Sequence, residues 1–251
     1  SLDRLKAELG AVELGLTMTY RCGRVITEAA AVLVPDIEAS PTVAEGEIRS
    51  VATIEALLKD VQPGDFVLSR INAPLAKVAM ALLRANIRAR IQGKDIGAGL
   101  IALVRELMTG KAASSIPAFL ERLVRWETRE VERAKKMDRE DRVESVQDKA
   151  ETLRVISEGV FGPRELEARL TMLFADDGTA QIVCSSVHKA KGLEARRVFV
   201  LQDTLYPKFP IKKGKAAPSP EVVAARALEE ANIEYVAITR AQLELVWVSG
   251  K

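Results

Sequence analysis

The segment Cys184-Ser185-Ser186-Val187-His188-Lys189-Ala190-Lys191-Gly192-Leu193-Glu194 joins two apolar runs and holds the single histidine of the sequence. The runs, residues 182–184 and 198–201, predict two buried strands. The residues between them are polar and turn at Gly192. Because α/β proteins place their chemistry in loops at strand ends, we expect this loop to be functional.

Strand and helix patterns alternate on both sides of this loop. The predicted strands cover residues 48–52, 66–69, 87–91 and 243–248, and the predicted helices cover about 25–33, 54–61, 74–83 and 221–240. We also expect a short helix over 1–9, a strand over 12–18, and an N-terminal cap from Asn72 on the helix that contains Pro74. This alternation predicts an α/β fold with a mostly parallel sheet and helices on both faces.

A second region has helical spacing without a convincing strand, from Ile96 to about Phe174. Its charged part, residues 127–151, mixes acids and bases throughout. That mixture favours a solvated helix or helix pair over a rod that contacts DNA. We therefore divide the chain into a sheet domain, formed by residues 1–94 and 176–251, and a helical insertion over 95–175.

Composition limits the classes of function. The 251 residues are 48% hydrophobic, enough for one large domain with or without an insertion. A net charge of +2 excludes global attraction to a polyanion, so nucleic acid would need a local patch. Two isolated cysteines, Cys22 and Cys184, and one histidine do not make a zinc site. No apolar run is long enough for a membrane span, and a reducing, cytoplasmic setting fits best.

Four segments occur together and in order. They are Leu-Thr-Met-Thr-Tyr-Arg at 16–21, Val-Leu-Ser-Arg-Ile-Asn-Ala at 67–73, the loop at 186–194, and Glu229-Glu230 followed by Tyr-Val-Ala-Ile-Thr-Arg-Ala at 235–241. This set resembles the C-terminal half of UvrD/Rep-type superfamily 1 DNA helicases. The resemblance covers nearly the whole chain apart from the insertion, and the last two segments are the most specific. It implies a second RecA-like motor domain of an ATP-dependent 3′ to 5′ helicase or translocase.

The resemblance also implies roles for residues at an ATP site. Tyr20 matches a tyrosine that stacks on adenine, and Glu194, which follows the turn at Gly192, matches a glutamate that bonds the ribose. Arg21 and Arg240 match arginines that reach the γ-phosphate, Arg240 as the arginine finger. Arginine suits this role because its planar fork stays charged where negative charge develops. Alone, each has a blander interpretation: Arg240 is a basic residue at a helix C-terminus, and Arg21 a surface arginine.

Four further residues match contacts to single-stranded DNA: Arg70, Asn72, Ser186 and His188. A serine and a neutral imidazole can bond phosphates or bases without holding a strand too tightly to move. The loop at 186–194 would then touch DNA at one end and nucleotide at the other, a short route for coupling hydrolysis to translocation.

The sequence departs from the family pattern in what it lacks. It has no Gly-x-x-x-x-Gly-Lys-Ser/Thr and no acidic strand end for Mg²⁺, which in the family belong to the N-terminal motor domain. We expect this chain alone to hydrolyse ATP negligibly, with that domain and single-stranded DNA as partners. The alternatives are a non-catalytic helicase-like module for DNA binding or assembly, and another α/β nucleotide-binding enzyme, which the absent phosphate loop disfavours. The pathway stays open between repair, replication and phage growth.

Overall fold

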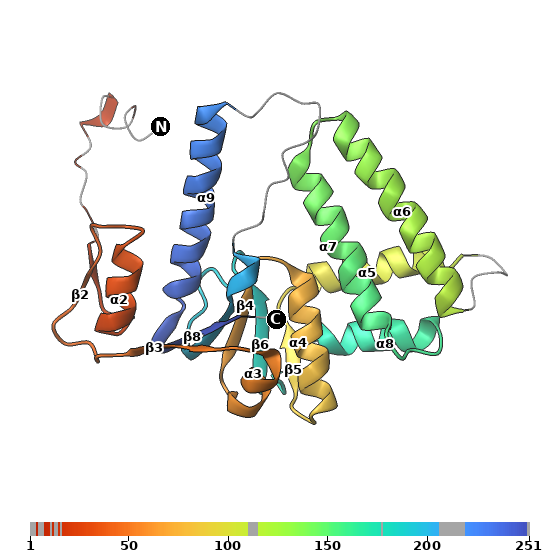
Figure 1. The fold of residues 1–251 in the computed structure, drawn as a ribbon, viewed down its shortest axis with the longest axis horizontal. Helices are drawn as coiled ribbons and strands as arrows, with labels where there is room; N and C mark the ends of the chain where they lie inside the picture. Colours follow the sequence, from red (N-terminus) through yellow and green to blue (C-terminus); the bar gives the residue numbers. More distant parts are fainter. Residues whose placement is uncertain are drawn as a thin grey trace.

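The computed structural model describes residues 17–109, 115–176, 178–205 and 219–249, together with Arg4, Val12, Gly15 and residues 8–10 (Figure 1). Most of the predicted helix over 1–9 and most of the predicted strand over 12–18 lie outside the described residues, although Arg4, Glu8 and Leu9 are helical. What is described of that strand is β1 (Met18–Thr19), which pairs in parallel with β2 (Glu38–Ala39).

Six strands form the main sheet, and every neighbouring pair is parallel. In spatial order they are β3 (Glu47–Val51), β8 (Ala241–Val248), β7 (Ala195–Leu201), β4 (Phe66–Ser69), β6 (Ile182–Ser186) and β5 (Ala89–Ile91). Each overlaps a predicted strand: β4, β6 and β7 contain apolar runs, whereas β3 (Glu-Ile-Arg-Ser-Val) mixes polar and apolar residues. The predicted α/β fold with a mostly parallel sheet is confirmed.

The helices lie on both faces of the sheet and at one end of it (Figure 1). They are α2 (Arg24–Ala31), α3 (Ile54–Asp60), α4 (Asn72–Arg84), α5 (Lys94–Leu107), α6 (Ile116–Lys136), α7 (Glu140–Ser157), α8 (Pro163–Leu173) and α9 (Pro220–Ile238), with the 3₁₀ helix η1 (Gln202–Thr204). The helical spacing predicted between Ile96 and Phe174 corresponds to α5–α8. The charged stretch 127–151 is a helix pair, the end of α6 and most of α7.

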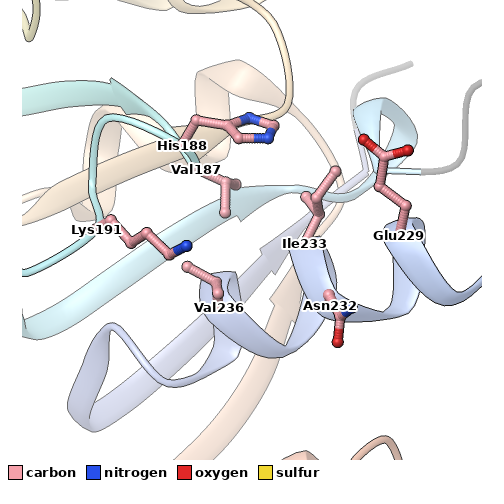
Figure 2. Close-up of a pocket in the computed structure, with 7 residues that line it drawn as sticks. All are labelled: Val187, His188, Lys191, Glu229, Asn232, Ile233 and Val236. Atoms are coloured by element: carbon pink, nitrogen blue, oxygen red, sulfur yellow. The ribbon is translucent and has the colours of Figure 1, made fainter. Parts of the chain in front are cut away.

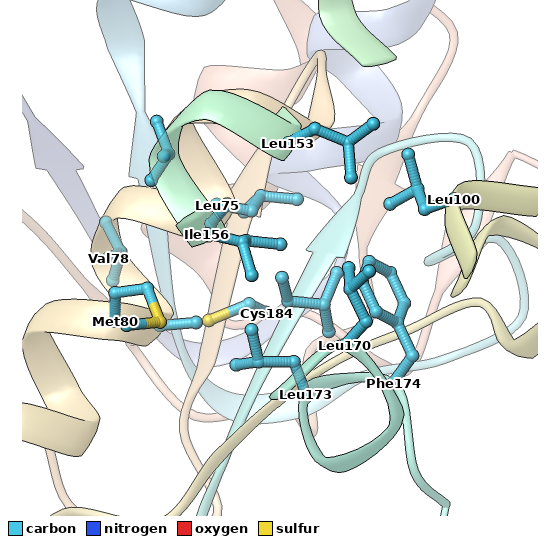
Figure 3. Close-up of a cluster of buried hydrophobic side chains, with 14 of the residues drawn as sticks. Leu75, Val78, Met80, Leu100, Leu153, Ile156, Leu170, Leu173, Phe174 and Cys184 are labelled. Atoms are coloured by element: carbon cyan, nitrogen blue, oxygen red, sulfur yellow. The ribbon is translucent and has the colours of Figure 1, made fainter. Parts of the chain in front are cut away.

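The helices α5–α8 share one apolar core with a face of the sheet. Leu153 and Ile156 of α7 lie with Leu75 of α4, and Leu173 of α8 lies close to Cys184 of β6 (Figure 3). A separately folded insertion would have a core of its own. The division into two domains stays a prediction, but the position of these helices is fixed by packing against the sheet.

The opposite face of the sheet is covered by α2, α9 and the connection between β6 and β7. That connection, which we call the crossover loop, is residues 187–194. It joins two parallel strands that flank β4 on either side. Parallel strands usually need a dozen residues or more for such a connection. Here the connection has eight residues, and Val187 and Ala190 are buried in the same core as Leu68 of β4 and Ile233 of α9.

A close approach of two glycines brings the start of the chain to the sheet. A Cβ on Gly23 would lie 2.8 Å from the Cα of Gly46, so only glycine fits there. The amide of Gly23 then donates to the carbonyl of Gln242 in β8 at 2.7 Å. This contact places Arg21 beside the amino ends of β7 and β8.

Candidate functional site

Three charged residues meet at the amino ends of β7 and β8, and we call them the amino-edge cluster: Arg21, Glu194 and Arg240. Glu194 directly precedes β7 and Arg240 directly precedes β8. The Nε of Arg21 lies 2.5 Å from Oε2 of Glu194. The other oxygen of Glu194, Oε1, accepts from Nε2 of Gln242 at 3.0 Å. Residues more than 200 positions apart in the sequence therefore form one site.

Arg240 is buried, with 8% of its surface exposed. Its Nε donates to the carbonyl of Val236 at 3.1 Å, and its Nη1 donates to the carbonyl of Leu193 in the crossover loop at 3.1 Å. Among the described residues, no carboxylate forms an ion pair with it. Burial, followed by the nearby charge of Arg21, lowers the pKa of Arg240. Carbonyls orient a guanidinium without neutralising it, so this buried cation lacks the counter-charge that burial normally demands.

The cluster therefore carries two guanidinium groups and one carboxylate. Perturbed, incompletely neutralised groups of this kind are concentrated at functional sites. Such an excess of positive charge fits a phosphate, for which arginine provides bidentate hydrogen bonds. The residues present on this chain thus fit the phosphate end of a nucleotide.

Tyr20 and Gly192 border the cluster at the surface. Tyr20 is 72% exposed, as a ring that stacks on a ligand would be. Gly192 is exposed, and its φ of +85° is left-handed, a conformation that glycine adopts without strain. Cys22 lies beneath, where its Sγ donates to the carbonyl of Thr239 at 3.6 Å. Burial raises the pKa of this thiol, which packs as a small neutral group.

The four predicted DNA-side residues lie at the opposite edge, where β4 and β6 end; we call them the carboxyl-edge cluster: Arg70, Asn72, Ser186 and His188. The register that pairs Ser69 with Ser186 brings the two strand ends side by side. Arg70 is neutralised there. Its Nε donates to both carboxylate oxygens of Glu230 in α9 at 3.0 Å, and its Nη2 donates at 2.6 Å.

The Arg70–Glu230 pair is buried, with side chains only 14% and 9% exposed. Glu144 of α7 lies 3.7 Å from the Nη1 of Arg70. The hydrogen bonding of Arg70 to the Glu230 carboxylate is the main reason that the pKa of Arg70 is raised. In this arrangement Arg70 has its counter-ion already.

Asn72 does not cap α4, so that prediction is wrong. The N-cap is Ile71, and the free amides of the first turn are bonded by Asp148, which reaches across from α7. Its carboxylate accepts from the backbone amides of Asn72 at 2.9 Å and Ala73 at 2.8 Å, and from Nδ2 of Asn72 at 2.8 Å. A carboxylate at a helix N-terminus satisfies these donors and complements the helix dipole. The remaining oxygen of Asn72, Oδ1, is buried and has no hydrogen-bond partner among the described residues.

Ser186 is buried, whereas His188 is exposed at the beginning of the crossover loop. His188 lines a groove of about 150 Å³ between this loop and α9 (Figure 2). The groove is lined by Val187, His188, Lys191, Glu229, Asn232, Ile233 and Val236. The crossover loop therefore borders the carboxyl edge at His188 and the amino edge at Glu194.

The sequence interpretation missed Glu230 and Asp148 as partners of Arg70 and Asn72. A signal was present: Glu140, Glu144 and Asp148 repeat every four residues, which places three acids on one face of a helix. That face points to the sheet domain, since Glu140 also pairs with Arg226 of α9 at 2.5 Å.

No group of three or more histidine, cysteine, aspartate or glutamate side chains within the described ranges is arranged to hold a metal ion. Among the same residues, none of the helices has the length and apolar character needed to cross a membrane.

Comparison with known protein families finds one match. The model of the UvrD-like helicase C-terminal domain matches residues 117–250, more than half of the chain. The matched region begins in α6 and includes the crossover loop, α9 and Arg240. No curated protein matches the chain.

Proposed function

Because the chain belongs to the UvrD-like helicase C-terminal domain family, we propose that its amino edge is half of an ATP site and its carboxyl edge meets single-stranded DNA. Arg21 and Arg240 contact the γ-phosphate, Glu194 the ribose and Tyr20 the adenine. Arg70, Asn72, Ser186 and His188 line the DNA track, and movement runs 3′ to 5′. The observation that carries the proposal is the buried guanidinium of Arg240, which has no carboxylate partner in the described part of the chain.

The chemistry asked of Arg240 is electrostatic. In phosphoryl transfer, negative charge spreads over the oxygens of the transferred group, and a fixed cation that is already desolvated stabilises it with little reorganisation. The carbonyls of Val236 and Leu193 hold the guanidinium in place before ATP arrives. Arg21 adds a second, more exposed cation, whose pairing with Glu194 can be exchanged for phosphate.

The other half of the ATP site would come from a phosphate-binding motor domain. The 251-residue sequence contains no Gly-x-x-x-x-Gly-Lys-Ser/Thr, so the phosphate cradle and the ligands of Mg²⁺ would lie on that partner domain. ATP would bind between the two domains. The free thiols of Cys22 and Cys184 suit a reducing, cytoplasmic setting.

The crossover loop would couple the two edges. Leu193, at one end, accepts a hydrogen bond from Arg240, and His188, at the other end, faces the proposed DNA track. Displacement of His188 by DNA would thereby reach the arginine finger. In the complete enzyme, His188→Ala is expected to reduce the stimulation of ATP hydrolysis by DNA. Unchanged stimulation would reject this coupling.

The direct test is an ATPase assay with single-stranded DNA on the complete enzyme that carries this domain. Arg240→Ala is expected to lower kcat by about 10³-fold, the typical effect of removing an arginine finger. Arg24→Ala serves as a matched control, since Arg24 is exposed on α2 and pairs with Glu28 and Glu45. Activity of Arg240→Ala near that of the control would remove the assigned role.

A non-catalytic DNA-binding or assembly module is the second candidate. The carboxyl edge favours an assembly role, since Arg70 and Asn72 are bonded to internal acids and not free for DNA. This candidate predicts no ATP hydrolysis by the complete enzyme, with or without Arg240.

A further inference from the structure

The groove between the crossover loop and α9 has an apolar floor and a polar rim. Val187 and Ile233 are buried in its floor, together with the half-buried Val236. The imidazole of His188 and the carboxylate of Glu229 lie along one rim, and the ammonium of Lys191 lies on the other side beside Val236 (Figure 2). Such a combination suits a ligand with a flat apolar face and a polar edge.

Its size restricts that ligand. A cavity of about 150 Å³ accommodates a single six-membered ring such as benzene, and this groove measures about 150 Å³. One pyrimidine ring matches this volume, whereas the fused rings of a purine would project from the open side of the groove.

The rim provides partners for a base. Bases stack on histidine and other aromatic rings in single-strand binding proteins, and a glutamate accepts a hydrogen bond from the N4 amino group of cytosine. Within the described residues, the side chains of His188, Lys191 and Asn232 make no hydrogen bond or ion pair, so they are available to a ligand. The carboxylate of Glu229 repels phosphate, so the backbone of a strand would pass on the side of Lys191.

The groove also lies next to the carboxyl-edge cluster. Glu229 adjoins Glu230 on α9, and its charge helps to raise the pKa of Arg70, behind the larger contributions of Glu230 and Glu144. A strand that follows the carboxyl edge from Asn72 to His188 therefore passes the mouth of the groove.

We propose that this groove binds one base of the single strand, and that Glu229 makes it prefer cytosine to thymine. The inference rests on the proposed contact of the carboxyl edge with single-stranded DNA. It adds a base-selective contact to the proposed DNA track.

The test compares the affinity of this chain for three labelled strands of about 12 nucleotides, within the usual range of site sizes. One strand is all dC, one is all dT, and one has abasic sugars throughout; binding is followed by fluorescence anisotropy at fixed salt. The dC strand is expected to bind about tenfold more tightly than the abasic strand, as stacking of one base gives. It is also expected to bind severalfold more tightly than dT, because thymine offers Glu229 no amino group.

Two exposed glutamates on α9 provide the variant and its control. Glu229→Ala is expected to abolish the difference between dC and dT, whereas Glu221→Ala, which removes the same charge from the same helix outside the groove, is expected to keep it. Equal, salt-dependent binding of all three strands to the wild type would overturn the base groove and leave the proposed function intact. Tighter binding of dT would overturn the role of Glu229. Failure of every strand to bind at low salt would overturn the DNA contact itself.

Discussion

The two edges of the sheet hold arginine in opposite ways. At the amino edge, Arg240 is buried with two carbonyls and the hydroxyl of Thr239 as its partners, and Arg21 pairs with a single carboxylate, Glu194, that is itself partly exposed. At the carboxyl edge, Arg70 is half-buried and is bonded to both oxygens of the buried Glu230. One edge thus keeps positive charge unneutralised, and the other neutralises it internally.

This difference matches the two ligands proposed for the edges. A triphosphate is a concentrated charge that must be stabilised strongly as it reacts, which calls for cations already desolvated. A strand that has to move must be released at every step, which calls for weaker polar and stacking contacts. Because Glu230 and Asp148 bond to Arg70 and Asn72, the carboxyl edge attracts a phosphate backbone only weakly.

The largest expected effect is a difference between Arg21 and Arg70 in the kcat of the complete enzyme. Arg21→Ala should lower kcat for ATP hydrolysis by about 10³-fold, since a cation facing the γ-phosphate is lost. Arg70→Ala should leave kcat much closer to the wild type and act on folding instead, because it strands the buried carboxylate of Glu230. Equal losses of kcat in the two variants would contradict the assignment of the edges.

Glu230→Ala is expected to destabilise this chain by about 3–5 kcal/mol in the free energy of unfolding, measured by urea denaturation. Removing one partner of a buried pair leaves the other charge uncompensated. The exposed pair of Arg24 with Glu28 provides the comparison, and Glu28→Ala should cause no measurable change. The double variant Arg70→Met/Glu230→Met should recover most of the stability, and failure to do so would mean that packing rather than charge explains the loss.

Asp148→Ala should cost about 1–2 kcal/mol, the usual effect of removing a helix cap. The loss is expected to appear first as faster amide hydrogen exchange at Asn72 and Ala73, whose amides bond to Asp148. Asp148→Asn keeps one acceptor oxygen and should restore part of the protection. Unchanged exchange in both variants would show that α7 does not hold the start of α4.

The smallest expected effect concerns the two cysteines. Burial raises the pKa of Cys22, and it raises that of Cys184 to about 12. Because the thiolate is the reactive form, both should react slowly with a thiol reagent at pH 8. Cys22 should react before Cys184, since it lies near the surface cluster rather than in the core between β6 and α8. The reverse order, measured by mass spectrometry, would mean that the contact between β6 and α8 opens more readily than the surroundings of Cys22.

Much of the fold could be predicted from local pattern. The runs at 66–69, 182–184 and 198–201 are apolar enough to be strands whatever surrounds them, and the helix at 24–31 follows from its spacing. The convergence of Arg21, Glu194 and Arg240 followed only from the resemblance, because the Gly23–Gly46 contact that enables it joins segments without a shared pattern. Their catalytic roles stay predictions.

The partners of the DNA-side residues escaped prediction for a physical reason. Glu230 and Asp148 are 160 and 76 residues away from the side chains they bond. Nothing in a local stretch of sequence indicates which acidic side chain will pair with Arg70 or with Asn72. Asn72 is an example. Its position at the start of a helix favours a capping role, yet the carboxylate of Asp148, from another helix, accepts the hydrogen bonds of the first backbone amides. Long-range pairing overrides local preference at such a position.

The shortness of the crossover loop has one more consequence. Ser186 pairs with Ser69 of β4, one residue beyond Leu68, which pairs with Val200 of β7. To reach Ala195, the loop must therefore run back along about six residues of β7, or about 20 Å. It also crosses two strand spacings of the sheet, or about 10 Å. The nine steps from Ser186 to Ala195 span at most about 30 Å when fully extended. A tether that uses most of its reach has little slack, and pulling on one end moves the other. Insertion of a few glycines would let each end move without the other. The short length of the loop, as much as its chemistry, therefore couples movements at its two ends.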